Sequence, residues 1–103
     1  MAYSVVITNE AARDIDAILN YLVEQLHAPQ AAAALMAEYD EILDKLESYP
    51  YMFEESRISM HRKVTYHKFL LGKYVGLYQV QETEKCVSIA RIFHGSQNYR
   101  KYL

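Results

Sequence analysis

The stretch that decides the fold runs from residue 64 to residue 95 and reads VTYHKFLLGKYVGLYQVQETEKCVSIARIFHG. It is rich in Val, Ile, Tyr and Phe, which favour β-strands. Two turn-sized breaks, at residues 71–73 and 81–85, divide it. The pattern predicts an antiparallel meander. Its strands are expected over residues 64–71, 74–80 and 86–93, and a shorter strand can occupy residues 57–61.

The preceding half of the chain has a helical pattern. A short β-branched run over residues 3–8 predicts a first strand, and Thr8 or Asn9 can cap the helix that follows. Apolar residues then recur at steps of three and four, which predicts a helix over residues 9–27. Pro29 suits the first turn of a second helix, which Tyr49-Pro50-Tyr51 should end. The sequence therefore predicts an α+β fold in which an antiparallel helical hairpin covers one face of an antiparallel sheet.

Length and composition limit the remaining possibilities. A chain of 103 residues is expected to form one domain, over residues 1–103, with one hydrophobic core. The single Cys86 excludes an internal disulfide and a cysteine-based zinc site. Because no apolar run is long enough to span a bilayer and the N-terminus lacks the pattern of a signal peptide, we expect a soluble, cytoplasmic protein that makes no membrane contact.

The charge is divided unevenly along the chain. Residues 1–56 hold two Lys/Arg against eleven Asp/Glu, whereas residues 57–103 hold nine Lys/Arg against two. A basic second half indicates an acidic or polyanionic partner. The alternative is that the two halves attract each other within the fold.

Several side chains of the second half could carry chemistry. Metal-free RNA cleavage needs groups that take and give protons and a cation that stabilises the phosphate. Each candidate also has a structural interpretation: alternation along a strand would turn Arg91 to solvent, and His94 suits a turn. His61 and His67 lack a recognised metal spacing, so we predict no metal site and no cofactor. The eligible residues are His61, Arg62, Lys63, His67, Lys68, Lys73, Arg91, His94 and Tyr99.

Three stretches together resemble a known family over essentially the whole chain. They are residues 9–21 (NEAARDIDAILNY), 66–80 (YHKFLLGKYVGLYQV) and 87–100 (VSIARIFHGSQNYR). Their residues and order resemble the RelE/ParE superfamily of toxins from type II toxin–antitoxin systems. The resemblance implies a toxin that is silenced by a cognate antitoxin, and it agrees with the predicted element order β-α-α-β-β-β. The basic second half predicts that this antitoxin is acidic.

Members of the family act in two different ways. This sequence departs from the pattern of the RelE-like members, which favours the ParE-like members. RelE-like members are ribosome-dependent mRNA endoribonucleases, whereas ParE-like members, which include plasmid stabilisation proteins, act on DNA gyrase and block replication. RelE-like sequences typically carry an arginine where this chain has Val75, and a basic cluster where it has residues 95–98. The resemblance is therefore closer to the ParE-like, non-catalytic members. A degenerate copy that binds antitoxin without toxicity is a further possibility.

These two chemistries assign the candidate residues differently. A nuclease would use His94 or Tyr99 to move protons. A gyrase-binding toxin would instead spread its contacts over the basic surface and the tail. The target-binding residues predicted in that case are Arg62, Lys68, Arg91, His94, Arg100 and Lys101.

Overall fold

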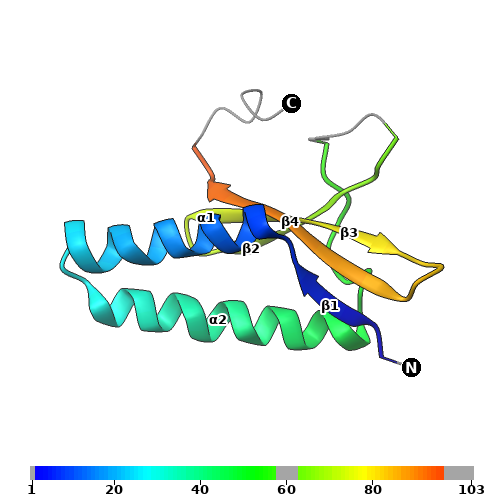
Figure 1. The fold of residues 1–103 in the computed structure, drawn as a ribbon, viewed down its shortest axis with the longest axis horizontal. Coiled ribbons are helices and arrows are strands. Elements are labelled where there is room, and N and C mark those ends of the chain that lie inside the picture. The colour runs from blue at the N-terminus through cyan, green and yellow to red at the C-terminus, as the bar shows by residue number, and fades with distance from the viewer. Residues whose placement is uncertain (1, 58–62, 97–103) are drawn as a thin grey trace.

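The computed structural model describes residues 2–57 and 63–96. Figure 1 shows two helices lying side by side along one face of a twisted sheet. This β-α-α-β-β-β arrangement confirms the predicted α+β class. The elements are β1 (Ser4–Ile7), α1 (Asn9–Asn20), a short π-helix η1 (Tyr21–Gln25), α2 (Pro29–Ser48), β2 (His67–Leu71), β3 (Tyr74–Gln81) and β4 (Cys86–His94).

Local signals fix the ends of both helices. The Thr8 side chain accepts a hydrogen bond from the Ala11 amide and so caps α1, and Pro29 occupies the first turn of α2. The prediction of one regular α-helix over residues 9–27 is wrong in its last turns. There the Leu26 amide bonds to the Tyr21 carbonyl at 3.1 Å, an i to i+5 spacing that makes η1 a π-helix.

The sheet is mixed, with strand order β1-β4-β3-β2. The pairs β2–β3 and β3–β4 are antiparallel, which confirms the predicted meander, but β1 pairs with β4 in parallel. The predicted antiparallel sheet consisted of the strands after the helical hairpin, and the parallel pairing of β1 adds a strand whose partner the sequence did not predict. The helical hairpin separates β1 from the meander and brings the chain back so that β4 runs alongside β1 in the same direction.

β2 begins later in the chain than predicted, and the segment that follows α2 contacts its start. The strand begins at His67 rather than at residue 64. Ahead of it, Glu55 forms an isolated antiparallel bridge to His67, and the Ser56 amide bonds to the Tyr66 carbonyl at 2.7 Å. The shorter strand expected over residues 57–61 lies outside the described residues, apart from Arg57, which is not in a strand.

The main core fills the space between the helices and the sheet. Its buried members include Ile15 of α1, Tyr39 and Leu46 of α2, and Phe69 and Ile89 of the sheet. The opposite face carries a smaller cluster of Tyr66, Val75, Leu77 and Phe93. Among the described residues, no helix is long and apolar enough to cross a membrane.

Candidate functional site

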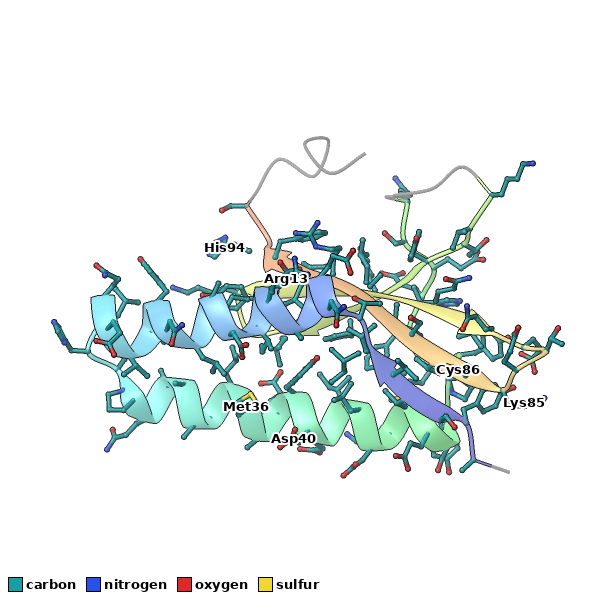
Figure 2. The ribbon with its side chains drawn as sticks, viewed as in Figure 1. Arg13, Met36, Asp40, Lys85, Cys86 and His94 are labelled. Atoms are coloured by element: carbon teal, nitrogen blue, oxygen red, sulfur yellow. The ribbon has the colours of Figure 1, made fainter. Side chains whose placement is uncertain are left out.

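An open groove of about 500 Å³ lies between the first helix and the end of the sheet. Figure 2 shows His94 at the end of β4, on the same side of α1 as Arg13. The groove is of the size that small ligands or partner side chains occupy. We call it the β4 groove, and its lining residues are Asp14, Ala17, Ile18, Tyr21, Tyr74, Ile92, Phe93, His94 and Ser96.

An ion pair fixes α1 against β4 at one side of the groove. The Arg91 guanidinium donates to both oxygens of the Asp14 carboxylate, at 2.7 and 3.1 Å. The same carboxylate accepts the Ile92 amide at 2.9 Å. The pairing of β1 with β4 ends at Ile7–Ile89, so β1 does not reach the Ile92 amide. The Asp14 carboxylate supplies the acceptor for this backbone N–H instead. The three bonds hold α1 and β4 at a fixed separation and thereby shape the groove.

The structure corrects the expectation that alternation turns Arg91 to solvent. Leu77 pairs with Arg91 and Tyr78 pairs with Ile89, so Ala90 is an extra residue in β4. Such a β-bulge interrupts the alternation of side chains and re-aims the residue that follows it. The Arg91 side chain is only 22% exposed and pairs with Asp14. It has a structural partner, and its predicted role in target binding stays a prediction.

His94 is held at the inner wall of the groove by its own turn. Its Nδ1 accepts the Ser96 amide at 3.1 Å and lies 2.7 Å from the Ser96 hydroxyl. An Nδ1 that accepts an amide proton must carry its lone pair there, so the neutral ring bears its proton on Nε2. The edge of the ring meets Tyr74 with centroids 5.4 Å apart. His94 can thus donate a hydrogen bond from Nε2. The predicted bond to backbone is present, although His94 is the last residue of β4 and the turn begins after it.

Two tyrosines form the aromatic walls of the groove. Tyr21 is 50% exposed and begins η1, while Tyr74 begins β3 and is half-buried. Burial, and secondarily the nearby Tyr21 phenol, raise the pKa of Tyr74. The Tyr74 phenol is therefore a neutral hydrogen-bond donor at physiological pH. Short π-helical segments often occur at functional sites, and this one begins at a groove residue.

Reasoning from the sequence missed Asp14, Tyr21 and Ser96 as site residues. A signal for the first two was present, because Asp14, Ile18 and Tyr21 are spaced by four and three and so share one helix face. The apolar pattern of the helix drew attention to its buried side instead. No comparable signal marks Ser96.

Two other candidates from the sequence lie away from the groove. Lys68 is on β2 and forms an ion pair with Glu54 at 3.6 Å, and it does not line the groove. His67 is buried, its Nδ1 donates to the Phe53 carbonyl at 2.9 Å, and its ring stacks on Tyr78. His67 is therefore a structural residue of the core.

The remaining candidates are either exposed side chains or lie outside the described residues. Within residues 2–57 and 63–96, no cluster of three His, Cys, Asp or Glu side chains suits a metal ion. Lys63 and Lys73 are both exposed. The candidates His61, Arg62, Tyr99, Arg100 and Lys101 lie outside the described residues.

A family model and several solved structures resemble this chain. The model described as the ParE toxin of the type II toxin–antitoxin system parDE matches residues 5–99. The chromosomal ParDE toxin–antitoxin system of P. aeruginosa contains a chain with 22% identity and a TM-score of 0.69, over 90% of this chain and 96% of that one. No curated protein matches the sequence.

Two RelE-type complexes share the fold at a greater structural distance. The RelBE2 toxin–antitoxin complex of Mycobacterium tuberculosis has 21% identity and a TM-score of 0.57, over 91% of this chain and 99% of that chain. The archaeal RelE–RelB complex of Pyrococcus horikoshii OT3 has 19% identity and a TM-score of 0.56, over 95% and 100%. At these identities the likeness concerns the fold alone.

Proposed function

Because this chain belongs to the ParE toxin family of type II toxin–antitoxin systems, we propose that it binds DNA gyrase, that this binding blocks replication, and that a cognate antitoxin neutralises it. The proposal treats the protein as a binding poison rather than as an enzyme. It uses the β4 groove as the main contact surface for the target.

The environment of Val75 is the main observation that favours a binding poison over a nuclease. A nuclease of the resembling type has an arginine at this position, where a cation can stabilise the charge that develops on phosphate. Here Val75 is 8% exposed and packs with Leu77 and Phe93 in the smaller cluster. An apolar, buried side chain supplies no such charge.

The chemistry of the groove also supports binding rather than catalysis. Its carboxylate, Asp14, already neutralises Arg91, and Nδ1 of His94 is already bonded to Ser96. The surface that the groove presents to a ligand is an apolar floor, which includes Ile18, between walls formed by tyrosines. Tyrosines beside an apolar floor are typical of residues that dominate binding energy at protein interfaces.

Charge supports an acidic antitoxin as the second partner. Arg13 precedes Asp14 on α1 and Lys73 precedes Tyr74 on β3, and both are exposed next to residues that line the groove. An acidic segment that is disordered when free could dock there and fold, guided by these charges. The solved structures that share this fold are complexes of a toxin with its antitoxin.

The proposal is tested with the purified protein in a gyrase supercoiling assay, beside a check of transcript integrity in cells that express it. We expect inhibited supercoiling and intact transcripts. Tyr21→Ala should weaken inhibition roughly 10-fold or more, as loss of a central interface tyrosine does. Tyr49→Ala is the matched control, since Tyr49 is a similarly exposed tyrosine at the end of α2, away from the groove.

Other outcomes would identify the alternatives. Cleaved transcripts with normal supercoiling would overturn the proposal and indicate a ribosome-dependent endoribonuclease. The observation that favours this second candidate is the presence of His94 among the groove residues, because histidine is the side chain that general acid–base catalysis uses most often. In that case His94→Gln should reduce cleavage about 10²- to 10⁴-fold. Normal growth with intact transcripts and normal supercoiling would indicate a degenerate, non-toxic copy.

A further inference from the structure

The π-helix η1 changes the side on which the first helix presents its last apolar residue. The apolar residues that predict the buried side are spaced by four, three and four, and they are Ile15, Leu19, Leu22 and Leu26. A continuous α-helix would keep Leu26 on that side, about 140° around the helix axis from Tyr21. The Leu26 side chain is instead 53% exposed.

The backbone of η1 sets Leu26 in line with a groove residue. The Leu26 amide donates to the Tyr21 carbonyl at 3.1 Å, across five residues rather than four. One π-helical turn therefore separates the two residues, and Leu26 follows Tyr21 along the same side of the helix. Tyr21 is half exposed and lines the β4 groove. We call Tyr21 and Leu26 the η1 ridge, which begins at the groove and continues beyond it.

The opposite wall of the groove has no room for an added strand where β1 ends. The Ala90 carbonyl accepts the Thr8 hydroxyl at 3.1 Å. The Ile92 amide donates to the Asp14 carboxylate at 2.9 Å. A strand that paired with β4 at this point would find both backbone groups already bonded. A partner in the groove must therefore gain its binding energy from the burial of side chains, among which the exposed apolar ones contribute most.

The η1 ridge and the β4 groove share Tyr21, so a partner that covers this tyrosine next meets Leu26. We infer that Leu26 is a contact residue for the target, and that η1 extends the gyrase-binding surface beyond the groove. The inference rests on the proposed function, in which gyrase binds at the β4 groove. Its physical basis is that binding removes from water an apolar side chain that η1 holds exposed.

The test compares Leu26→Ala with the wild type and with Tyr21→Ala, in the supercoiling assay and in binding to immobilised, purified gyrase. We expect Leu26→Ala to weaken both inhibition and binding roughly 5-fold or more, as loss of an interface anchor does. Val23→Ala is the matched control, because Val23 is an exposed apolar residue of the same π-helix but lies two positions from Tyr21, on another side. It should change inhibition by no more than about 2-fold.

A second substitution separates the loss of a contact from a loss of stability. Leu26→Gln keeps the length of the side chain and a high helix propensity but removes its apolar character. It should weaken inhibition and binding as much as Leu26→Ala does. Circular dichroism and the Tm of each variant show that it is folded.

The outcomes distinguish this inference from the proposed function. Unchanged inhibition by both Leu26 variants, with weakened inhibition by Tyr21→Ala, would overturn the inference alone. Equal losses in Leu26→Ala and Val23→Ala would overturn it too, because the direction that η1 gives to Leu26 would then have no effect. Normal supercoiling in the presence of the wild type would overturn the proposed function and the role of Leu26 with it. A concentration-dependent dimer in sedimentation that Leu26→Ala abolishes would make a second copy the occupant instead of gyrase.

Discussion

The hydroxyl group of Tyr39 is buried in the core and has no hydrogen-bond partner among the described residues. Burial raises the pKa of Tyr39 to about 12. A buried hydroxyl without a partner costs free energy, because it has lost its hydrogen bonds to water. Tyr39→Phe should therefore leave the free energy of unfolding unchanged or raise it by about 1 kcal/mol, as measured by urea denaturation.

Tyr78 provides the matched control at the same scale. It too is fully buried, but its hydroxyl donates to the Pro50 carbonyl at 2.9 Å. Tyr78→Phe leaves that carbonyl without its partner and should lower the free energy of unfolding by about 1–2 kcal/mol. Equal destabilisation by the two substitutions would show that the Tyr39 hydroxyl has a partner in solution.

At the scale of elements, the ion pair between Asp14 and Arg91 joins α1 to β4. Asp14→Asn removes the charge and leaves one acceptor oxygen for three donors. Because the Asp14 side chain is only 16% exposed, we expect a loss of about 1–3 kcal/mol in the free energy of unfolding. Chemical denaturation measures this loss.

A neighbouring acid on the same helix controls for the change of helix charge. Asp16 is exposed on α1, so Asp16→Asn should change stability by no more than about 0.5 kcal/mol. A double-mutant cycle of Asp14→Asn with Arg91→Ala should give a clear coupling energy. Additive effects of the two substitutions would contradict the structural role assigned to the pair.

The elements also show which features a sequence can predict. Local signals such as the Thr8 cap, Pro29 and the apolar periodicity located both helices, and the β-forming runs with their turn-sized breaks located the meander. The last turns of the first helix and the start of β2 differ from these predictions. The bulge at Ala90 and the parallel pairing of β1 depend on contacts between distant segments, and no local pattern announces them. The same limit applies to the groove, because Asp14 and Ile92 meet only through tertiary packing.

At the scale of the whole molecule, the uneven distribution of charge along the chain bears on two properties, the stability of the fold and the binding of a partner. Arg91 with Asp14 and Lys68 with Glu54 join the basic second half to the acidic first half, so part of the asymmetry stabilises the fold itself. Arg13 and Lys73 beside the groove are the cations that we expect a partner to use. The sequence could predict the asymmetry but not this division, because the partner of each charge is set by the fold.

One surface cluster joins three distant parts of the chain. The Glu82 carboxylate, in the turn between β3 and β4, accepts hydrogen bonds from the phenols of Tyr3 and Tyr51 and lies 2.8 Å from Nζ of Lys85. These contacts tie the N-terminal segment and the segment after α2 to the turn. Hydrogen bonds from Lys85, Tyr3 and Tyr51 lower the pKa of Glu82 from 4.5 to about 2.

This lowered pKa predicts a stability that depends on pH. A carboxyl whose pKa is lower in the folded state stabilises the fold above its unfolded pKa of 4.5, and loses that contribution as the pH falls towards about 2. The Tm of the wild type should exceed that of Glu82→Gln at pH 7, and the difference should shrink between pH 4.5 and pH 2. Glu84→Gln, a change in the same turn, should show no such convergence. Because the cluster is exposed, added salt should reduce the difference at neutral pH. A Tm difference between wild type and Glu82→Gln that stays constant down to pH 2 would mean that the carboxylate does not tie these segments together in solution.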